Sequence, residues 1–335
     1  MAMWRDLFAR ALWWKEYRQV RFMLWFMLLG MFMMMGFLRI EEWLLTSDDV
    51  IARKVAMYKE YELRGNSSYN WGENYAFARL LLGSLAFLMS VWQIGFERRN
   101  KISEMTFSLP YHRSTVYGVK WLLGVVFITG SMVVNGAIDI LVIETSALAQ
   151  FIDVHEVILA SMHVSVAAIA VYTFTLGLGT VCGSWLSQTV LTGIFLFLFQ
   201  FFDECYRIIK DIFYPYRVYA WSGGPPSNFS ILGWVVNYPD TEYYMTILPI
   251  IIFCLLFGAW LYKHNNLEHN GRIAIFPIIE KMLGLGFAFC CSLVGGIILS
   301  NSFFGEKSGF YIGFILLGGL GYLLFSRLTR VKIKF

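Results

Sequence analysis

Eight long apolar stretches divide the sequence, and they constrain the fold more than any other feature. A bilayer has a hydrocarbon core about 30 Å thick, which a helix crosses in roughly 20 residues. Only 15% of the residues are charged, whereas soluble chains average about 25%. We therefore expect an all-α integral membrane protein with about eight transmembrane helices. The predicted spans are 22–38, 76–96, 116–142, 157–182, 188–204, 245–262, 280–300 and 309–326.

The fifth predicted span is the weakest, because its apolar run ends at Phe202 and is followed by Asp203 and Glu204. It is either short or continues as an amphipathic helix through Tyr206 into an external structure. The other spans are long and carry few charges, so we treat residues 1–335 as a single transmembrane domain.

Lys and Arg residues are concentrated in alternate connections between the spans, and this sets the predicted orientation. Positive residues are retained on the cytoplasmic side of a membrane. Most of the 27 Lys and Arg residues lie before span one, between spans two and three, between spans six and seven, or after span eight. Both termini are therefore predicted to be cytoplasmic, with the chain a multi-pass protein of the plasma membrane. The net charge of +4 is too small to indicate nucleic acid as a partner.

Span one is predicted to remain as an anchor, because Arg39 and Glu41 follow it where a signal peptide would have small residues. The chain has five cysteines, of which only Cys205 is predicted to lie near the outer face. An odd number with one external member gives no disulfide framework, so we interpret the cysteines as packing residues.

The segment before span one, residues 3–21, has the pattern of an amphipathic helix. Its charged residues, among them Arg10 and Glu16, fall away from a face of apolar and aromatic residues. Tryptophan suits headgroup depth, and each basic residue near an anionic leaflet contributes about 1 kcal/mol. We expect a helix in the cytoplasmic interface, either a simple topology anchor or an element that moves with span one. The residues of its apolar face are Trp4, Leu7, Phe8, Ala11, Leu12 and Trp14.

The connection between spans two and three, residues 97–115, predicts a short amphipathic helix on the cytoplasmic side. Its apolar stripe is Ile102, Met105 and Leu109, and Pro110 ends it because proline disfavours helical geometry in the preceding residue. Such a helix has a shape that fits a groove on a cytoplasmic partner, and the alternative is a solvated positive loop. The exposed side is predicted to carry Arg98, Arg99, Lys101 and Glu104.

Two external segments are predicted, residues 39–75 and residues 203–244. In the first, Ser47 is a candidate cap for a helix with acidic residues in its first turn that ends near Arg64. The second contains Gly and Pro residues in its middle and is either a re-entrant element or a plain loop.

The usual motifs of catalysis and nucleotide binding do not occur in the sequence. No G-x-x-x-x-G-K-[ST] loop is present, so we expect this chain to bind no nucleotide by itself. His264 and His269 are five residues apart, which is not the spacing of two zinc ligands on one helical face. Ser222 has Gly and Pro neighbours that favour a turn, and no histidine is near it. We expect no catalytic residue, no metal and no cofactor bound by this chain.

Polar residues within the spans are few, and Asp139 is the most informative because a carboxylate in a membrane is costly unless it is paired or hydrated. On the predicted topology it lies near the outer end of span three, at a depth similar to Arg79. A pair with Arg79 would offset the cost, and the simpler alternative is a carboxylate that reaches the outer interface. A gate or a substrate contact is the third interpretation. The intramembrane polar candidates are Arg79, Asn135, Asp139 and His163.

Three segments follow an order of residues that is typical of one family of membrane proteins. In ERRNKISEMTFSLPYHRSTVYGVK, residues 97–120, an acidic residue, basic residues, a leucine-proline pair, an arginine and a lysine follow in turn. The other two are the lead-in ALWWKEYRQVRF and the small-residue stretch GLGTVCGSWLSQTVLTG between spans four and five. From the N-terminus through span six the chain resembles the type-2 ATP-binding-cassette (ABC) permeases, and bacterial peptide-export and antibiotic-resistance permeases are similar to it.

The resemblance implies a half-transporter whose ATPase is a separate cytoplasmic polypeptide. Two ATPase copies, which bind ATP and Mg, would work with two permeases, this chain and a second copy that is identical or homologous. The lead-in would be the connector helix, residues 22–262 the six-span core, and the pathway would lie near spans one, two and five. The additional hairpin, residues 280–326, departs from the family. On this resemblance the ATPase-docking residues are Glu97, Arg98, Arg99, Lys101, Ile102, Glu104, Met105, Leu109 and Arg113.

Two other classes of function remain beside the export of an amphipathic or hydrophobic peptide, toxin, antibiotic or lipid-like molecule. One is a membrane sensor or scaffold subunit that does not transport, and the other is an intramembrane enzyme. Co-purification with an ATPase distinguishes the exporter from both.

Overall fold

The structure, a computed structural model, describes residues 9–63, 71–100, 102–214, 233, 235, 241–265, 271, 273–302 and 306–328. Within these residues the chain is helical apart from one isolated β-bridge. Eight helices of the described part are long and apolar enough to cross a membrane, which confirms the predicted all-α membrane fold. They are Arg10–Leu45, Phe77–Arg99, Arg113–Thr145, Val154–Val181, Trp185–Phe213, Tyr244–Lys263, Pro277–Ser300 and Lys307–Arg327.

The chain forms two compact units, each built from separate parts of the sequence. The first unit comprises Met1–Gln93, Pro110–Leu176 and Trp234–Ala259, and the second comprises Ile94–Leu109, Gly177–Gly233 and Trp260–Phe335. Two helices, α9 (Val154–Val181) and α12 (Thr241–Lys263), contribute residues to both units, and the single transmembrane domain stays a prediction.

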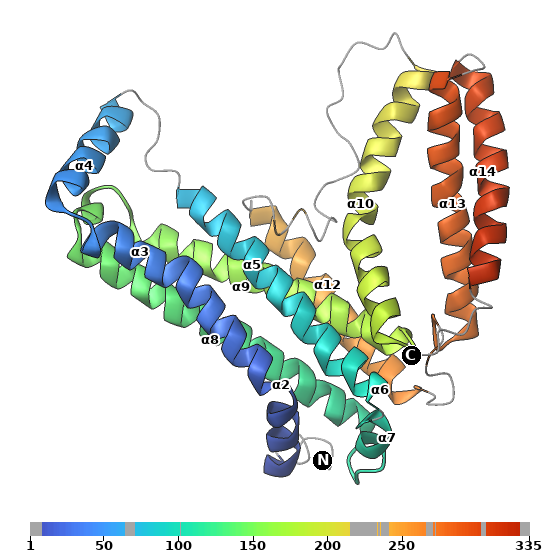
Figure 1. Cartoon of the computed structure of the whole chain (residues 1–335), viewed down its shortest axis with the longest axis horizontal. Coiled ribbons are helices and arrows are strands. Elements are labelled where there is room, and N and C mark those ends of the chain that lie inside the picture. Colours follow the sequence, from blue (N-terminus) through green and yellow to red (C-terminus); the bar gives the residue numbers. More distant parts are fainter. Residues whose placement is uncertain are drawn as a thin grey trace. The chain divides into compact units, whose positions relative to one another are not determined.

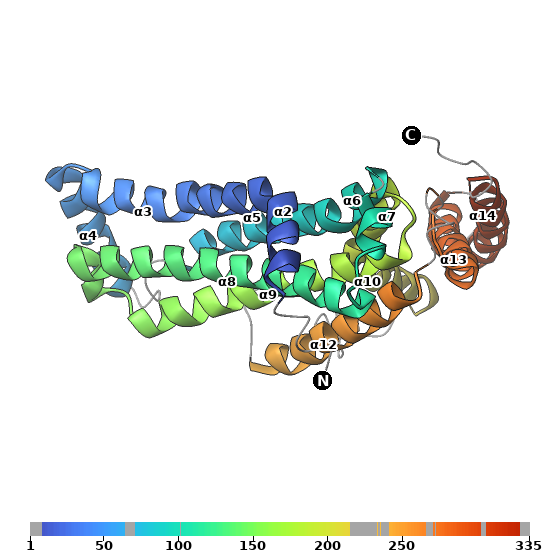
Figure 2. The same ribbon diagram turned by 90° about the horizontal axis from the view of Figure 1, so that it is seen from below.

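The first unit is a bundle of long helices (Figure 1). The first span begins as α2 (Arg10–Met31), which packs on α8 (Arg113–Thr145) and on α5 (Trp71–Val91). Figures 1 and 2 both show α8 and α9 side by side, joined by a short 3-10 turn. The order of the remaining elements of the first span is η1 (Phe32–Phe37), α3 (Leu38–Ile40) and η2 (Glu41–Leu45).

The first span is longer than predicted, because the lead-in and the span form one continuous helical segment from Arg10 to Leu45. Its first turns run in a different direction from the rest (Figures 1 and 2). The buried residues of α2 recur every three or four positions, which is the stripe of a helix that packs on protein. Trp14 is 60% exposed and Glu16 fully buried, so the prediction that Glu16 lies on the polar face is wrong. The buried stripe is Leu12, Glu16, Val20, Leu24, Met27 and Met31.

The helix predicted after span one is confirmed as α4 (Asp48–Leu63), with Asp48 and Asp49 in its first turn, and its external location stays a prediction. The backbone carbonyl of Ser47 accepts the N–H of Val50 at 2.9 Å. α4 is fastened to the end of the first span by a ring stack of Trp43 on Tyr58, with centroids 6.0 Å apart. The second external segment lies mainly outside the described residues, so its re-entrant interpretation stays a prediction.

The second unit contains α10 (Trp185–Phe213), α13 (Pro277–Ser302) and α14 (Glu306–Leu328). α10 continues well beyond Phe202, which confirms the amphipathic interpretation of the fifth span over the short one. An ion pair between Arg207 and Asp203, 2.7 Å apart, lies on its exposed side. α13 and α14 pack closely along their length as the predicted hairpin.

The turn between α9 and α10 pairs with the connection that follows α12. Cys182 and Ala274 form an antiparallel β-bridge, and the N–H of Ile275 donates to the carbonyl of Val181 at 2.8 Å. Burial raises the pKa of the Cys182 thiol to about 12, so the side chain stays neutral and packs as an apolar group. Two predicted cytoplasmic connections of the second unit are therefore fixed to one another.

Candidate functional site

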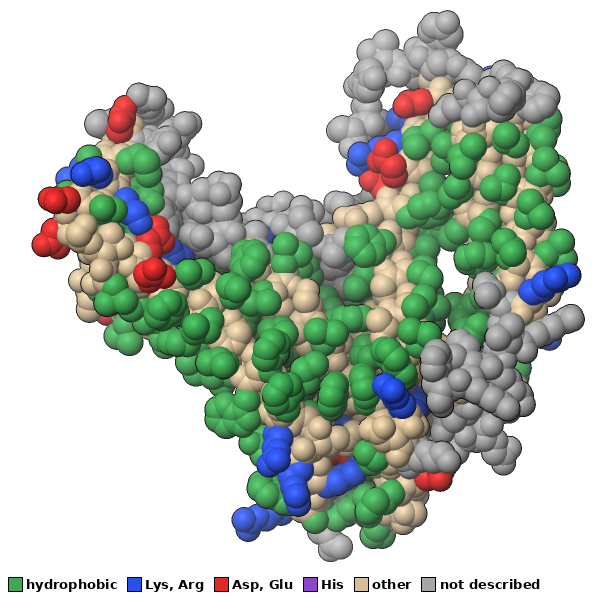
Figure 3. Space-filling model, viewed as in Figure 1, with side chains coloured by type: hydrophobic (Ala, Val, Ile, Leu, Met, Phe, Trp, Pro, Cys, Tyr) green, Lys and Arg blue, Asp and Glu red, His purple; other side chains and the backbone are tan. Residues whose placement is uncertain are grey.

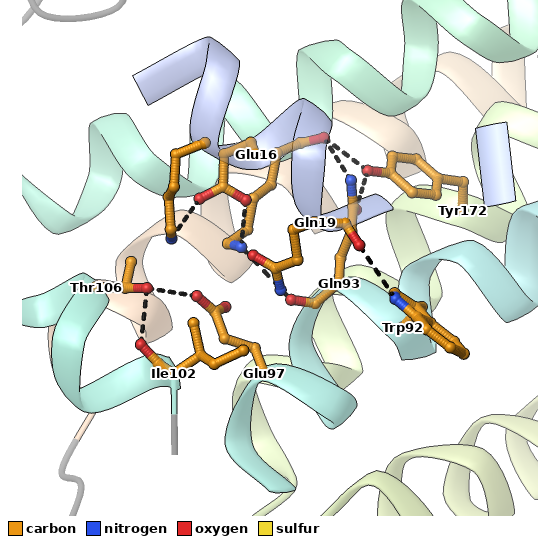
Figure 4. A network of polar contacts seen from close by, with 10 residues as sticks. Glu16, Gln19, Trp92, Gln93, Glu97, Ile102, Thr106 and Tyr172 are labelled. Carbon is orange, nitrogen blue, oxygen red and sulfur yellow. Dashed lines mark hydrogen bonds and ion pairs between the residues drawn. The ribbon is translucent and has the colours of Figure 1, made fainter. Parts of the chain in front are cut away.

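The connection between the second and third spans forms two short helices, α6 (Glu97–Arg99) and α7 (Ile102–Phe107). Glu97 is buried, and its Oε1 accepts a hydrogen bond of 2.6 Å from the hydroxyl of Thr106 (Figure 4). The same hydroxyl is 3.0 Å from the carbonyl of Ile102 within α7, so its one proton can go to either acceptor. The contact with Glu97 holds α7 against α6 and gives the connection a defined shape.

Arg98 fastens the connection to the rest of the second unit. Its side chain is 8% exposed, and Nη2 donates to the carbonyl of Thr180 at 3.4 Å. Asn265 donates to the same carbonyl, also at 3.4 Å. The prediction that Arg98 lies on the exposed side is therefore wrong, because the three-residue helix α6 directs this side chain into the protein.

The accessible side of the connection combines one apolar residue with charged groups. Met105 is 69% exposed, although the sequence places it in the apolar stripe. Glu104 is also exposed, and the guanidinium of Arg99 lies over the ring of Trp185 at 5.6 Å. α7 instead buries Ser103 and Thr106, so its polar residues face the protein and its methionine faces outward. Ile102, Leu109 and Arg113 are half-buried, and Lys101 lies outside the described residues.

A buried ion pair joins the first and third spans within the first unit. Lys120 Nζ lies 2.6 Å from Glu16 Oε2, and both side chains are fully buried. Lys15 Nζ approaches the other oxygen of Glu16 at 2.8 Å. The ammonium of Lys120 also donates to the carbonyl of Gln93 at 3.4 Å, which extends the contact to the second span (Figure 4).

Tyr172 of α9 completes this inner network. Its hydroxyl lies 2.6 Å from Gln93 Oε1 and 2.8 Å from the carbonyl of Lys120, and it can donate to either (Figure 4). The ring fits against Gly124, where a Cβ atom would lie 2.2 Å from Tyr172 Cζ. Four helical segments thus meet at one set of buried polar groups, which the sequence did not single out apart from Lys120. The one available signal was Glu16, an acidic residue in register with Leu12 and Val20.

A second polar cluster lies in the predicted outer half of the same unit. Asp139 is fully buried, with Arg39 Nε 3.5 Å from its Oδ1 and the hydroxyl of Tyr75 donating to its Oδ2 at 3.0 Å. Among the contacts of the described residues none joins Asp139 to Arg79, so the predicted pair is wrong, as is the alternative of a carboxylate at the interface. The Tyr75 hydroxyl is also 3.3 Å from that of Ser161.

The other intramembrane candidates are buried around this cluster. Asn135 donates to the carbonyl of Ser131 at 2.8 Å. The ring of His163 lies edge-on to that of Tyr244, with centroids 6.1 Å apart. Arg79, Asn135 and His163 are all nearly inaccessible, so these polar side chains are packed within the protein.

π-helical turns lie beside buried charged residues in both units. η1 and η2 flank Arg39, and η3 (Trp92–Phe96) follows α5 and leads into α6. A π turn adds a residue to the helical turn and rotates everything after it, and such turns occur frequently at functional sites. The rotation carries Arg39 into the bundle.

Comparisons with protein-family models, with curated proteins and with solved structures find no match to this chain. The residues themselves therefore carry the functional argument. The described residues include no group of three or more His, Cys, Asp or Glu side chains that could hold a metal ion. The structure thus has an accessible short helix, α7, whose buried side is bonded to α6. It also has two buried polar clusters, around Lys120 and around Asp139, that join the long helices of the first unit.

Proposed function

We propose that this multi-span membrane protein is the permease subunit of an ABC transporter of the type-2 class. A separate cytoplasmic ATPase would dock on residues 97–113 and hydrolyse ATP with Mg, and two permeases and two ATPases would form the working unit. The cargo would be an amphipathic or hydrophobic molecule that is exported from the cell.

The observation that carries this proposal is the exposure of Met105 on a helix that is held firmly. At 69% exposure the side chain of Met105 is available to pack against a cytoplasmic partner. Glu104 and Arg99 surround it with charges of both signs, which favour specific docking over general adhesion. The bond of Glu97 to Thr106 ties α7 to α6, and the bond of Arg98 to Thr180 ties α6 to the end of α9. A partner bound at α7 would therefore act on a segment with a fixed position.

The chain offers a direct mechanical route from such a partner to the spans. η3 and α6 continue the helix of α5, and α8 begins at Arg113, four residues after Leu109. A displacement of the connection would therefore act on the second and third spans through the backbone. The pair of Lys120 with Glu16 would pass the movement of the third span to the first.

Export of an apolar or amphipathic cargo suits the surface of the spans. Large apolar side chains such as Phe22, Trp25 and Met33 are exposed along the first span. In a membrane this surface contacts lipid, a second permease or an apolar cargo, and a small ion would find no polar path along it. Buried polar residues of the first unit, such as Glu16, Asp139 and Tyr172, are instead held in ion pairs and hydrogen bonds.

The second candidate function is a sensor or scaffold subunit that does not transport. The exposed Met105 supports it equally, since a regulatory partner would cover the same surface. The two functions differ in whether binding of the partner is tied to ATP hydrolysis and cargo movement.

Affinity purification of the tagged full chain from its native host in a mild detergent, with an ATPase assay of the eluate, tests the proposal. We expect recovery of a soluble subunit with a phosphate-binding loop and ATPase activity, both lost in Met105→Asp. Met57→Asp makes the same substitution at an exposed methionine of α4 and is expected to retain both. Recovery of the correctly inserted chain alone, without ATP hydrolysis, would refute the transporter.

Two further variants separate docking from transport. Glu104→Arg reverses an exposed charge, and Leu109→Asp places a charge at the end of the connection. Both are expected to uncouple transport and leave membrane insertion unchanged. Full ATP-dependent transport by both would show that the docking surface lies elsewhere.

A further inference from the structure

A groove lies between the first turns of α2 and the middle of α8, within the first unit. Its volume of about 770 Å³ falls in the range of roughly 300–1,000 Å³ that is typical of small-molecule sites. Figure 3 shows Lys and Arg side chains gathered around the lower end of α2, next to a hydrophobic surface. The lining residues are Arg10, Ala11, Trp13, Trp14, Tyr17, Leu123, Val126 and Phe127.

The walls of the groove are aromatic and held in place. The ring of Tyr17 stacks between those of Trp14 and Phe127, with centroids 5.8 and 6.3 Å away. The indole N–H of Trp25 donates to the Tyr17 hydroxyl at 3.2 Å, which fixes the orientation of the ring. Trp and Tyr favour the depth where headgroups meet acyl chains, because one end of each side chain is apolar and the other polar.

The described side chains at the groove carry positive charge. Arg10 lines it, and Arg18 and Arg21 are exposed on the same helix. Within the described part of the chain, no carboxylate forms an ion pair with any of these three. Glu16, the acidic residue of α2, is buried and forms ion pairs with Lys120 and Lys15. Its charge therefore does not compensate the arginines at the groove.

We propose that this groove binds an anionic phospholipid of the cytoplasmic leaflet. The phosphate would lie at Arg10, the glycerol region among Trp13, Trp14 and Tyr17, and an acyl chain along Val126 and Phe127. A cation at the rim and an apolar floor match an amphiphile with an anionic head. A free anion would leave the floor uncovered, and a neutral lipid would leave Arg10 without a partner.

Such a lipid would hold the first turns of α2 against α8, the two helices that the Glu16–Lys120 pair already joins. It would therefore act as a separable part of the contact between the first and third spans. The inference concerns lipid binding only, and it stands whether or not the protein is a transporter.

Native mass spectrometry of the purified full chain in a neutral detergent tests the site. The probes are palmitoyl-oleoyl phosphatidylglycerol and the phosphatidylcholine with the same acyl chains. We expect preferential retention of phosphatidylglycerol by the wild type. Arg10→Gln is expected to weaken that retention about fivefold, the equivalent of about 1 kcal/mol for one basic residue near an anionic surface.

Two further variants distinguish lipid binding in this groove from attraction of an anionic lipid to any basic residue of the protein. Val126→Trp fills the floor of the groove and is expected to reduce retention of both lipids. Arg327→Gln removes an exposed arginine at the end of α14, far along the sequence from the groove, and is expected to change nothing. Thermal unfolding of each variant shows that it is folded.

Three outcomes would overturn the proposal. Equal retention of the two lipids would show that the groove holds any acyl chain and that Arg10 selects none. Equal losses of phosphatidylglycerol retention in Arg10→Gln and Arg327→Gln would show that the lipid responds to the overall positive charge and not to this groove. Retention of neither lipid would show that a second copy or another part of the protein fills the groove.

Discussion

The most informative residues of this protein are charged side chains that are fully buried, where a charge costs free energy. Removal of a carboxylate and an ammonium from water costs several kcal/mol each, and only close pairing with further hydrogen bonds offsets it. Glu16 and Lys120 meet this condition, because Lys15 also pairs with the carboxylate and the carbonyl of Gln93 accepts from the ammonium. Their pairing specifies one arrangement of the first three spans, which apolar side chains alone would not fix in a lipid environment.

We expect Lys120→Met to destabilise the protein by about 3 kcal/mol, because it leaves a buried carboxylate with Lys15 as its remaining partner. Glu16→Leu combined with Lys120→Met removes both charges and is expected to recover most of the loss. Thermal unfolding in detergent measures the effect. Lys54→Met breaks a partly exposed ion pair with Glu42 and is the control, with an expected cost of at most about 1 kcal/mol. Equal losses in the two single variants would contradict the buried network.

Gly124→Ala tests the contact that places the Tyr172 hydroxyl. The added methyl would overlap the tyrosine ring, so we expect a loss of about 1–3 kcal/mol and a displaced hydroxyl. Gly130→Ala in the same helix meets no atom within 4 Å and is expected to be neutral or stabilising, because alanine favours helix. Chemical denaturation of both variants in parallel gives the comparison. A tolerated Gly124→Ala would mean that Tyr172 does not pack there.

Helices in this protein pair by two different means. In the first unit long helices are joined through buried polar groups at both ends. In the hairpin of α13 and α14, small residues let the two backbones approach each other, which is how helices associate where water supplies no driving force. A Cβ atom at Gly313 would lie 2.1 Å from the carbonyl oxygen of Gly295.

Gly313→Ala is therefore expected to separate α13 from α14 locally. Hydrogen exchange of peptides that contain Gly295 and Gly313 should increase, and the thermal unfolding temperature should fall. Gly319→Ala lies on the same helix with nothing within 4 Å and should leave both unchanged. Unchanged exchange in Gly313→Ala would show that the hairpin is not closely packed.

The first span illustrates what hydropathy can and cannot predict about an element. Its apolar centre was predicted correctly, because Met, Phe and Leu dominate it. Its ends were not, since the segment begins at Arg10 and η2 keeps it helical as far as Leu45, and η1, which precedes Arg39, rotates that side chain inward. Nothing in a regular helical period indicates an added residue, so the partner of Asp139 was assigned to Arg79 instead.

At the scale of the whole molecule, the sequence predicted the fold well and the sites only in part. Eight apolar runs give eight long helices because each run is long enough to cross a bilayer. The buried pair of Glu16 and Lys120 joins residues 104 positions apart, and no local pattern relates them. The prediction for Arg98 was wrong for a similar reason, because its partner Thr180 lies 82 residues away along the chain. A helix of three residues is also too short to show a periodic pattern.

The distribution of Lys and Arg predicts that both termini and the 97–115 connection are cytoplasmic, and that α4 is external. Ala52→Cys and Met105→Cys place thiols at exposed positions of α4 and α7. A membrane-impermeant maleimide should label the first in intact cells and the second only after permeabilisation. The wild type controls for the native cysteines. The reverse pattern would invert the topology and exclude an ATPase at Met105.

The most direct test of the central claim is a photo-crosslink from α7 in living cells. A photo-crosslinking amino acid placed at Met105 should form an adduct with a cytoplasmic ATPase that carries a phosphate-binding loop, identified by mass spectrometry. The same group at Ser103, which is 3% exposed on the opposite side of the helix, should form none. Absence of an ATPase adduct at Met105, in cells where the chain is inserted and expressed normally, would contradict the proposed function.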